Sequence, residues 1–158
     1  MSEHAPIVVP EPGWRPITTP VKTPRAPAFL RGGPAAGRLR VAWFERDDGA
    51  VVGRVWFGPG TEGPPGHAHG GSIAAVLDEA MGAAVWHAGH PVVAANLSVD
   101  FRRMLPLGTD ATFECHITSI EGRKVRTRGR LLGSNGELFA EGAGLYVMLT
   151  PEQAAMLG

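Results

Sequence analysis

Residues 66–91 read GHAHGGSIAAVLDEAMGAAVWHAGHP, a glycine-rich segment followed by an apolar one. In the second part, apolar residues recur at the spacing of one helical face. They are Ile73, Val76, Leu77, Ala80, Met81, Ala84 and Val85. Gly89 and Pro91 supply the signal that ends such a helix. The pattern therefore predicts one long helix whose apolar stripe must be covered by the rest of the domain.

Runs of β-favouring residues surround this helix. Two precede it, on either side of the hairpin signal Asp48-Gly49, at 39–46 and 50–57. Four follow it, separated by short glycine-containing turns, at 92–103, 111–121, 123–132 and 137–149. Apolar and polar residues alternate in two of these runs, as in a sheet with one buried face. The residues expected on that face are Leu97, Val99, Phe101, Phe113, Cys115 and Ile117. Because a parallel sheet would need a helix between strand pairs, we expect an α+β domain with an antiparallel sheet.

The chain length and the proline distribution predict a single domain with tails. At 158 residues there is room for one compact domain. Residues 1–36 hold eight of the 14 prolines and show no regular period, so we expect extended or irregular chain there. Its apolar residues are expected to lie over the domain, namely Ile7, Val8, Val9, Trp14 and Phe29. We expect a tail at 1–36, a domain at 37–150 and a short tail at 151–158.

The composition excludes several classes of protein. Lys plus Arg and Asp plus Glu both number 15, so no global field favours nucleic acid or an anionic membrane. Asp78 and Glu79 interrupt the best candidate for a membrane span, and no apolar leader follows a basic start. The single cysteine, Cys115, excludes an intramolecular disulfide and fits a reducing compartment. We therefore expect a cytoplasmic protein without a nucleic-acid or membrane partner.

The chemistry concentrates where a flexible glycine loop enters the helix. Backbone N–H groups at a helix start carry partial positive charge, and glycine lets a ligand oxygen approach them. Such a loop can hold an oxyanion. Two turns later Asp78 lies off the apolar stripe, beside the small residues Ala74, Ala75 and Gly82, which leave room for a substrate. The alternative is a loop with glycines for flexibility alone and two solvent-facing acids.

The pair His67 and His69 raises the question of a metal site, because two imidazoles one residue apart can reach the same ion. A metal-binding pair of this spacing belongs on a strand with further ligands nearby, whereas here a helix begins and Cys115 stands alone. We therefore favour no metal. His87 and His90 lie near the helix end, where capping or simple exposure explains them.

Several segments together resemble the hotdog-fold acyl-CoA thioesterases, most closely the PaaI-like group with its animal thioesterase-superfamily members. The motif is Gly63-Pro64-Pro65-Gly66, then Ala68-His69-Gly70-Gly71, Ile73-Ala74 and Asp78. The resemblance continues through 95–103, 106–107 and 121–124 and covers about residues 40–149. It implies a long helix wrapped in a curved antiparallel sheet. It also implies a homodimer with two active sites at the interface, and a dimer of dimers in many members.

The resemblance also implies roles for individual residues. The N–H of Gly70 would polarise the thioester carbonyl and stabilise the oxyanion. Asp78 of the other protomer would activate water or attack directly to give an acyl-enzyme anhydride. His69 would orient the loop or help to polarise the carbonyl, or would serve only as a structural histidine. Gly71 and Asn96 would bind substrate, and no metal or organic cofactor would be needed.

Two positions depart from the pattern of the relatives. Many relatives carry Asn or Gln, which contacts the thioester, where this chain has Gly63. Some place Ser or Thr, which positions the attacking water, where this chain has Ala94.

Basic residues are concentrated late in the chain. Seven of the 15 lie within 102–130, a local excess of four positive charges over the acids there. Arginine and lysine at strand ends can hold the phosphates of coenzyme A, and the candidates are Arg102, Arg103, Arg123 and Lys124. A solvated strand face is the simpler explanation for Arg126, Arg128 and Arg130. Few aromatic residues accompany the cluster, which disfavours single-stranded nucleic acid.

The sequence thus predicts an acyl-CoA thioesterase that releases a free acid and coenzyme A. Two alternatives remain open at this point. One is a non-catalytic acyl-CoA-binding or regulatory hotdog protein, and the other is a hotdog enzyme of another reaction type, such as a dehydratase.

Overall fold

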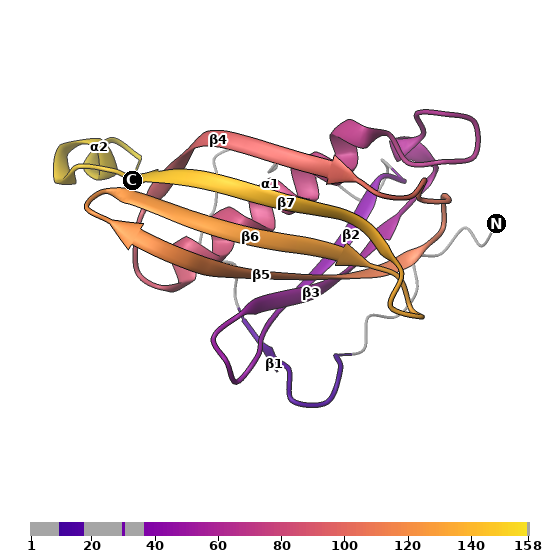
Figure 1. Ribbon diagram of the computed structural model, residues 1–158, viewed down its shortest axis with the longest axis horizontal. Coiled ribbons are helices and arrows are strands. Elements are labelled where there is room, and N and C mark those ends of the chain that lie inside the picture. Colours follow the sequence, from indigo (N-terminus) through magenta and orange to yellow (C-terminus); the bar gives the residue numbers. More distant parts are fainter. Residues whose placement is uncertain (1–9, 18–29, 31–36, 158) are drawn as a thin grey trace.

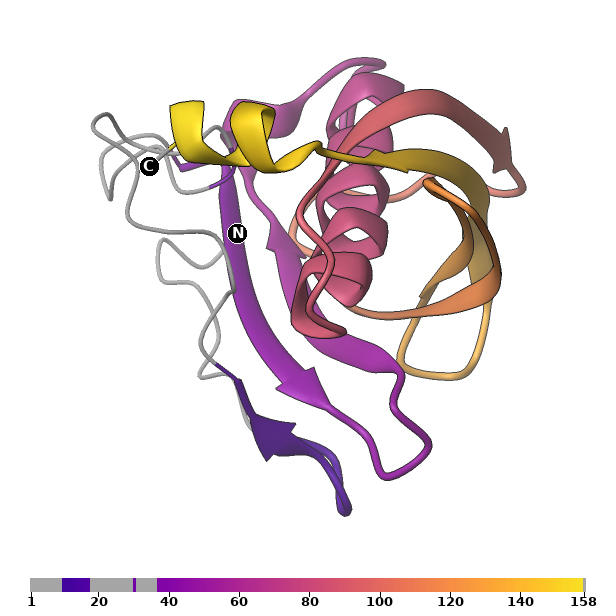
Figure 2. The same cartoon turned by 90° about the vertical axis from the view of Figure 1, so that its left-hand side faces the viewer.

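A computed structural model describes residues 10–17, 30 and 37–157 of the chain. It shows one antiparallel sheet in the order β1-β2-β3-β5-β6-β7-β4, curved around the long helix α1 (Figure 1 and Figure 2). The strands are β1 (Arg15–Pro16), β2 (Leu39–Glu45), β3 (Val51–Phe57), β4 (Val92–Phe101), β5 (Asp110–Glu121), β6 (Lys124–Leu132) and β7 (Leu138–Met148). The helices are α1 (Gly70–His87), the short α2 (Pro151–Met156) and the 3-10 turn η3 (Pro59–Thr61). The predicted α+β fold with one long helix and an antiparallel sheet is confirmed.

The hairpins follow from the turn chemistry read in the sequence. Gly49 between β2 and β3 has φ +85°, and Gly122 between β5 and β6 has φ +60°. These left-handed conformations suit glycine because it lacks a Cβ. The turns therefore set the antiparallel register that brings distant strands together around α1.

The apolar stripe of α1 forms the centre of the core. Leu77 and Met81 are fully buried and face the inner side of the sheet. A Cβ on Gly129 of β6 would lie 3.2 Å from Cγ of Met81, so glycine lets the strand approach the helix closely. Full burial of a side chain such as Leu77 contributes about 1.5–3 kcal/mol, which fixes α1 against the sheet.

Strand β4 differs from the prediction of one buried face. Phe113 and Cys115 on β5 are buried as predicted, but Leu97 and Phe101 on β4 are 38% and 54% exposed. The reason is topological, because β4 is the last strand of the sheet and has a single neighbour, β7. One helix does not cover the inner face out to this edge.

The segments predicted to be tails contribute regular structure. β1 pairs with β2, and Trp14 packs on Phe44 with ring centroids 5.6 Å apart. The other expected tail contacts, Ile7, Val8, Val9 and Phe29, lie outside the described residues. At the other end, α2 begins with a capping box of Thr150 and Gln153 and a proline in its first turn. The domain boundaries at 37 and 150 remain a prediction.

Among the helices that the structure describes, none has both the length and the apolar character needed to span a bilayer.

Candidate active site

The loop before α1 is held in place by hydrogen bonds rather than being the flexible segment that its glycines suggested. The N–H of His69 donates to the Thr61 carbonyl at 2.6 Å, and that of Ala68 donates to the Leu105 carbonyl at 2.8 Å. The Gly66 carbonyl accepts from the Leu107 N–H at 3.0 Å. These bonds tie the loop to η3 and to the segment after β4, and they fix the point at which α1 begins.

His69 caps the start of α1. Its Nδ1 accepts a hydrogen bond from the Gly71 N–H at 2.8 Å, and its backbone is extended, as a capping residue requires. Because Nδ1 is an acceptor, the proton of the neutral imidazole resides on Nε2. The amide of Gly71 is occupied by this bond, so a substrate contact at Gly71 would come from close approach rather than from its N–H.

The backbone N–H of Gly70 is the donor at the helix start that His69 does not cap. Neighbouring amides are engaged, because Gly71 donates to the His69 side chain and Ser72 to the His69 carbonyl. The Gly70 N–H has no hydrogen-bond partner among the described residues. It lies at the positive end of an 18-residue helix, where an oxygen that carries negative charge is stabilised.

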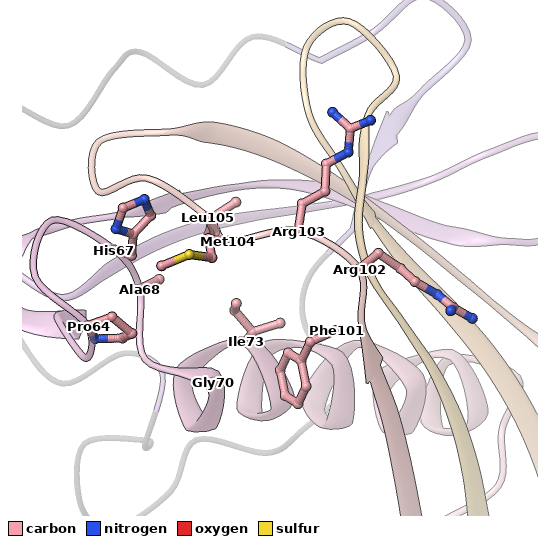
Figure 3. A pocket seen from close by; sticks show the side chains of 10 residues that line it. All are labelled: Pro64, His67, Ala68, Gly70, Ile73, Phe101, Arg102, Arg103, Met104 and Leu105. Carbon is pink, nitrogen blue, oxygen red and sulfur yellow. The ribbon is translucent and has the colours of Figure 1, made fainter.

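A cavity of about 290 Å³ opens beside Gly70 (Figure 3). Ile73 and Leu105 form its buried apolar floor, and Phe101 and Met104 stand 54% and 61% exposed at its side. A Cβ on Gly70 would lie 3.3 Å from Cζ of Phe101, so the aromatic ring lies close to the open amide. The cavity therefore combines one hydrogen-bond donor with apolar walls. No sequence pattern marks Phe101 or Met104 as lining residues, because nothing in the end of β4 or the segment after it predicts a contact with the loop.

Asp78 lies on the flank of α1 that faces β7. The hydroxyl of Tyr146 donates to Asp78, with Oδ1 and the backbone oxygen of Asp78 both at 2.8 Å from it. Asp78 does not line the cavity at Gly70. Asp78 is eight positions after Gly70, which is about 12 Å along the helix axis, so Gly70 and Asp78 of one chain do not reach the same atom.

The four basic candidates fall into two pairs at opposite ends of the sheet. Arg102 and Arg103 follow β4 and line the cavity, and Figure 3 shows their guanidinium groups extending away from Gly70. Arg102 pairs with Glu141, whereas Arg103 has no ion-pair partner among the described residues. Lys124 of β6 stands opposite Val147 of β7, whereas Phe101 at the end of β4 stands opposite Ala140. These two positions on β7 are seven residues, or about 24 Å, apart. Arg123 beside it donates to the Met148 carbonyl at 3.0 Å.

The remaining arginines of β6 lie on the outer face of the sheet. Arg126, Arg128 and Arg130 are exposed and alternate with the buried residues Val125 and Thr127. The simpler explanation, a solvated strand face, is confirmed for them.

Asn96 lies on β4 next to a bulge between Ala94 and Asn96. It is exposed and stands opposite Leu145, five residues before Phe101. That separation is about 17 Å along the strand, so Asn96 lies outside the cavity of its own chain.

Close packing of the loop explains the glycine at position 63. A Cβ built on it would lie 2.7 Å from Cα of His69, closer than real Cβ atoms come to backbone. The loop as folded thus has no space for an Asn or Gln side chain at this position.

The two histidines of the loop point to separate partners. Nδ1 of His67 lies 2.9 Å from the Pro65 carbonyl, while Nδ1 of His69 binds the Gly71 amide. Across the part of the chain that the structure describes, no three His, Cys, Asp or Glu residues gather as metal ligands would.

Comparison with known proteins places this geometry in a family. Residues 65–140, which include the loop, α1 and β4, match the model of the thioesterase superfamily. This chain carries a domain of the thioesterase superfamily. It is 38% identical over 95 residues to acyl-coenzyme A thioesterase THEM4 of Xenopus laevis, covering 60% of this chain and 43% of that protein. It is 32% identical over 133 residues to THEM4 of Bos taurus, covering 83% of this chain and 55% of the relative.

The thioesterase-superfamily domain also has structural relatives. A solved structure of a thioesterase superfamily protein is 34% identical and superposes with a TM-score of 0.65, covering 68% of this chain and 55% of that one. The chain therefore spans about half the length of the curated relatives and of this structure. The family match ends at residue 140, so Tyr146 lies beyond it. Tyr146 is the chain's single tyrosine, and the sequence pattern gave no signal that it contacts Asp78, 68 residues away.

Proposed function

We propose that this protein hydrolyses an acyl-CoA thioester to a free acid and coenzyme A. The observation that carries the proposal is the Gly70 N–H at the start of α1, which has no partner in the described part of the chain and faces an apolar cavity. A thioester presents a carbonyl oxygen that gains negative charge during attack, together with an apolar acyl chain. The Gly70 amide and the walls of the cavity suit these two parts.

The reaction needs an oxyanion donor and a carboxylate. The carbonyl oxygen accepts from the Gly70 N–H, and the protonated Nε2 of His69 is a second donor on the same loop. The Asp78 carboxylate either removes a proton from the attacking water or forms an anhydride that water then cleaves. In both routes the carbon–sulfur bond breaks, the thiolate of coenzyme A takes up a proton, and the acid is released.

A complete site requires a second chain. Gly70 and Asp78 of one protomer are about 12 Å apart along α1, too far to act on one carbonyl. The free edge of β4 and its exposed Val93, Leu97 and Phe101 provide the surface for a partner. We infer a homodimer in which Asp78 of one subunit faces Gly70 of the other. Sedimentation at micromolar concentration should give a dimer or a dimer of dimers, and a monomer with full activity would contradict this arrangement.

The same pairing bears on recognition of the nucleotide. In an antiparallel pair of β4 strands the start of one strand lies beside the end of the other. Lys124 lies level with the start of β4, because both Lys124 and Val93 pair with Val147. The dimer would therefore bring Lys124 and Arg123 of one subunit close to the cavity of the other subunit, which Arg103 of that subunit lines. We propose that these cations hold the phosphates of coenzyme A.

A second function has specific support, namely an acyl-CoA-binding protein without catalysis. Gly63 leaves no room for the side chain that contacts the thioester in many relatives, and Ala94 supplies no hydroxyl. Release of free thiol from a panel of acyl-CoAs separates the two functions. Hydrolysis by the wild-type protein supports the enzyme, whereas binding without thiol release supports the binding protein. The cytoplasmic location stays a prediction that cell fractionation tests.

A further inference from the structure

Tyr146 is placed to hold the carboxylate of Asp78 in one orientation. Its hydroxyl reaches Oδ1 and the backbone oxygen of Asp78, each at 2.8 Å. The side chain is almost entirely enclosed, with 3% of its surface exposed. A donor anchored both to the helix backbone and to the side chain restricts rotation of the carboxylate. Oδ2 of Asp78 has no hydrogen-bond partner among the described residues and is the oxygen left for a reaction.

Two glycines form the slot that holds the tyrosine ring. A Cβ on Gly82, one turn after Asp78 on α1, would lie 3.3 Å from Cε1 of Tyr146. A Cβ on Gly144, on the same face of β7, would lie 2.6 Å from Cε2. The ring as placed thus leaves no room for a Cβ at position 144, and a Cβ at position 82 would make a tight contact with it. Glycine in a helix interior is less stable than alanine, so Gly82 makes room for the tyrosine ring while it lowers the stability of α1.

The hydroxyl remains a donor at neutral pH. Burial, and then its bond to the Asp78 carboxylate, raise the pKa of Tyr146 above its ordinary value. The tyrosine hydroxyl is therefore protonated at neutral pH. A protonated hydroxyl that reaches Oδ1 stabilises the charged carboxylate and leaves the second oxygen without a hydrogen bond among the described residues.

We propose that Tyr146 is a positioning residue for the hydrolysis, acting through Asp78. The inference rests on the proposed function, since it assigns Asp78 its catalytic part. Because the Tyr146 hydroxyl acts through its bond to the Asp78 carboxylate, its effect should fall on turnover rather than on substrate binding.

The test compares Tyr146→Phe with a matched buried hydroxyl. Thr127 is also buried, and its Oγ1 donates to the Gly144 carbonyl at 3.3 Å without touching Asp78. Each change removes one buried hydroxyl, so Tyr146→Phe and Thr127→Val should both lower the melting temperature by about 2–4 °C. Tyr146→Phe should lower kcat about ten- to hundredfold with KM within about threefold, as expected for a lost bond to a charged group. Thr127→Val should keep kcat within about twofold.

Asp78→Asn, measured in parallel, separates failure of this inference from failure of the proposed function. If Asp78→Asn abolishes hydrolysis while Tyr146→Phe keeps the wild-type kcat, the positioning role is wrong and the catalytic carboxylate stands. Equal loss of kcat in Tyr146→Phe and Thr127→Val would show a general structural effect and also overturn the inference. If Asp78→Asn retains turnover, Asp78 is not the catalytic carboxylate and the role of Tyr146 falls with it, although the protein still hydrolyses acyl-CoA. If the wild-type protein hydrolyses no acyl-CoA, the proposed function itself fails.

Discussion

Replacing Gly70 by proline removes the backbone N–H of this residue and adds the proline ring. Proline is well tolerated at the first position of a helix, because the N–H it lacks has no partner within the helix. The preceding residue, His69, already has the extended backbone (φ −64°, ψ 135°) that a following proline requires. Loss of one oxyanion donor lowers kcat by about 100- to 1000-fold in enzymes that rely on it. We expect a loss of that size for Gly70→Pro.

Gly70→Ala is the matched control, because it adds the same Cβ and keeps the N–H. That Cβ would approach the exposed ring of Phe101 to 3.3 Å, a contact that a small movement of the ring relieves. Thiol release from an acyl-CoA, with both variants at equal dimer content, provides the assay. The alanine variant should keep kcat within about tenfold of wild type. If proline and alanine reduce kcat equally, the Gly70 amide is not the oxyanion donor.

Three further changes probe other parts of the account. Asp78→Asn should lower turnover by about 100-fold or more with a modest change in KM. Glu79→Gln should lower turnover much less, because Glu79 projects from another side of α1. If Glu79→Gln lowers turnover more than Asp78→Asn, the motif is aligned wrongly. Neutralising Arg103 together with Lys124 should raise KM for acyl-CoA and weaken its salt dependence, because exposed charges are screened. A thioester without the nucleotide should be hydrolysed almost as before, and equal losses on both substrates would assign these cations to folding. Gly63→Asn should lower the free energy of unfolding by about 1–3 kcal/mol, since its Cβ would meet the His69 backbone at 2.7 Å; an unchanged chemical denaturation curve would contradict the steric account.

The parts of the fold that depend on local chemistry could be predicted from the sequence. The stripe from Ile73 to Val85 predicted α1, and Gly49, Gly122 and Gly136 marked hairpin turns that take positive φ. Periodicity and turn residues act within a few positions of each other, so one sequence contains the whole signal.

The exposed face of β4 could not be predicted, because the alternation of Leu97, Val99 and Phe101 indicates burial without saying by what. In one chain that face is uncovered, since β4 forms the edge of the sheet. The same limit applies to the short helix α2, which is too brief for a periodic signal.

The candidate site was predicted only where its residues are neighbours in sequence. The loop motif placed His69 and Gly70 at the start of α1, where the structure has them. The contact between Tyr146 and Asp78 joins residues on β7 and α1, and no local pattern records it. The basic residues formed one cluster by position in the sequence, yet the strand directions place Arg102 and Lys124 at opposite ends of the sheet. Long-range placement of this kind depends on strand order, which the sequence does not display.

Complementation between two inactive chains tests the shared catalytic site most directly. Gly70→Pro and Asp78→Asn chains, carrying different affinity tags, are co-expressed and the mixed dimer is isolated through both tags in turn. One of its two sites then combines an intact Gly70 with an intact Asp78, while the other carries both changes. If Gly70 and Asp78 of different subunits act on one acyl-CoA, the mixed dimer should release thiol at about half the wild-type rate, far above either parent. A rate no higher than that of the parents would contradict the account, because each site of one chain would then hold one defect.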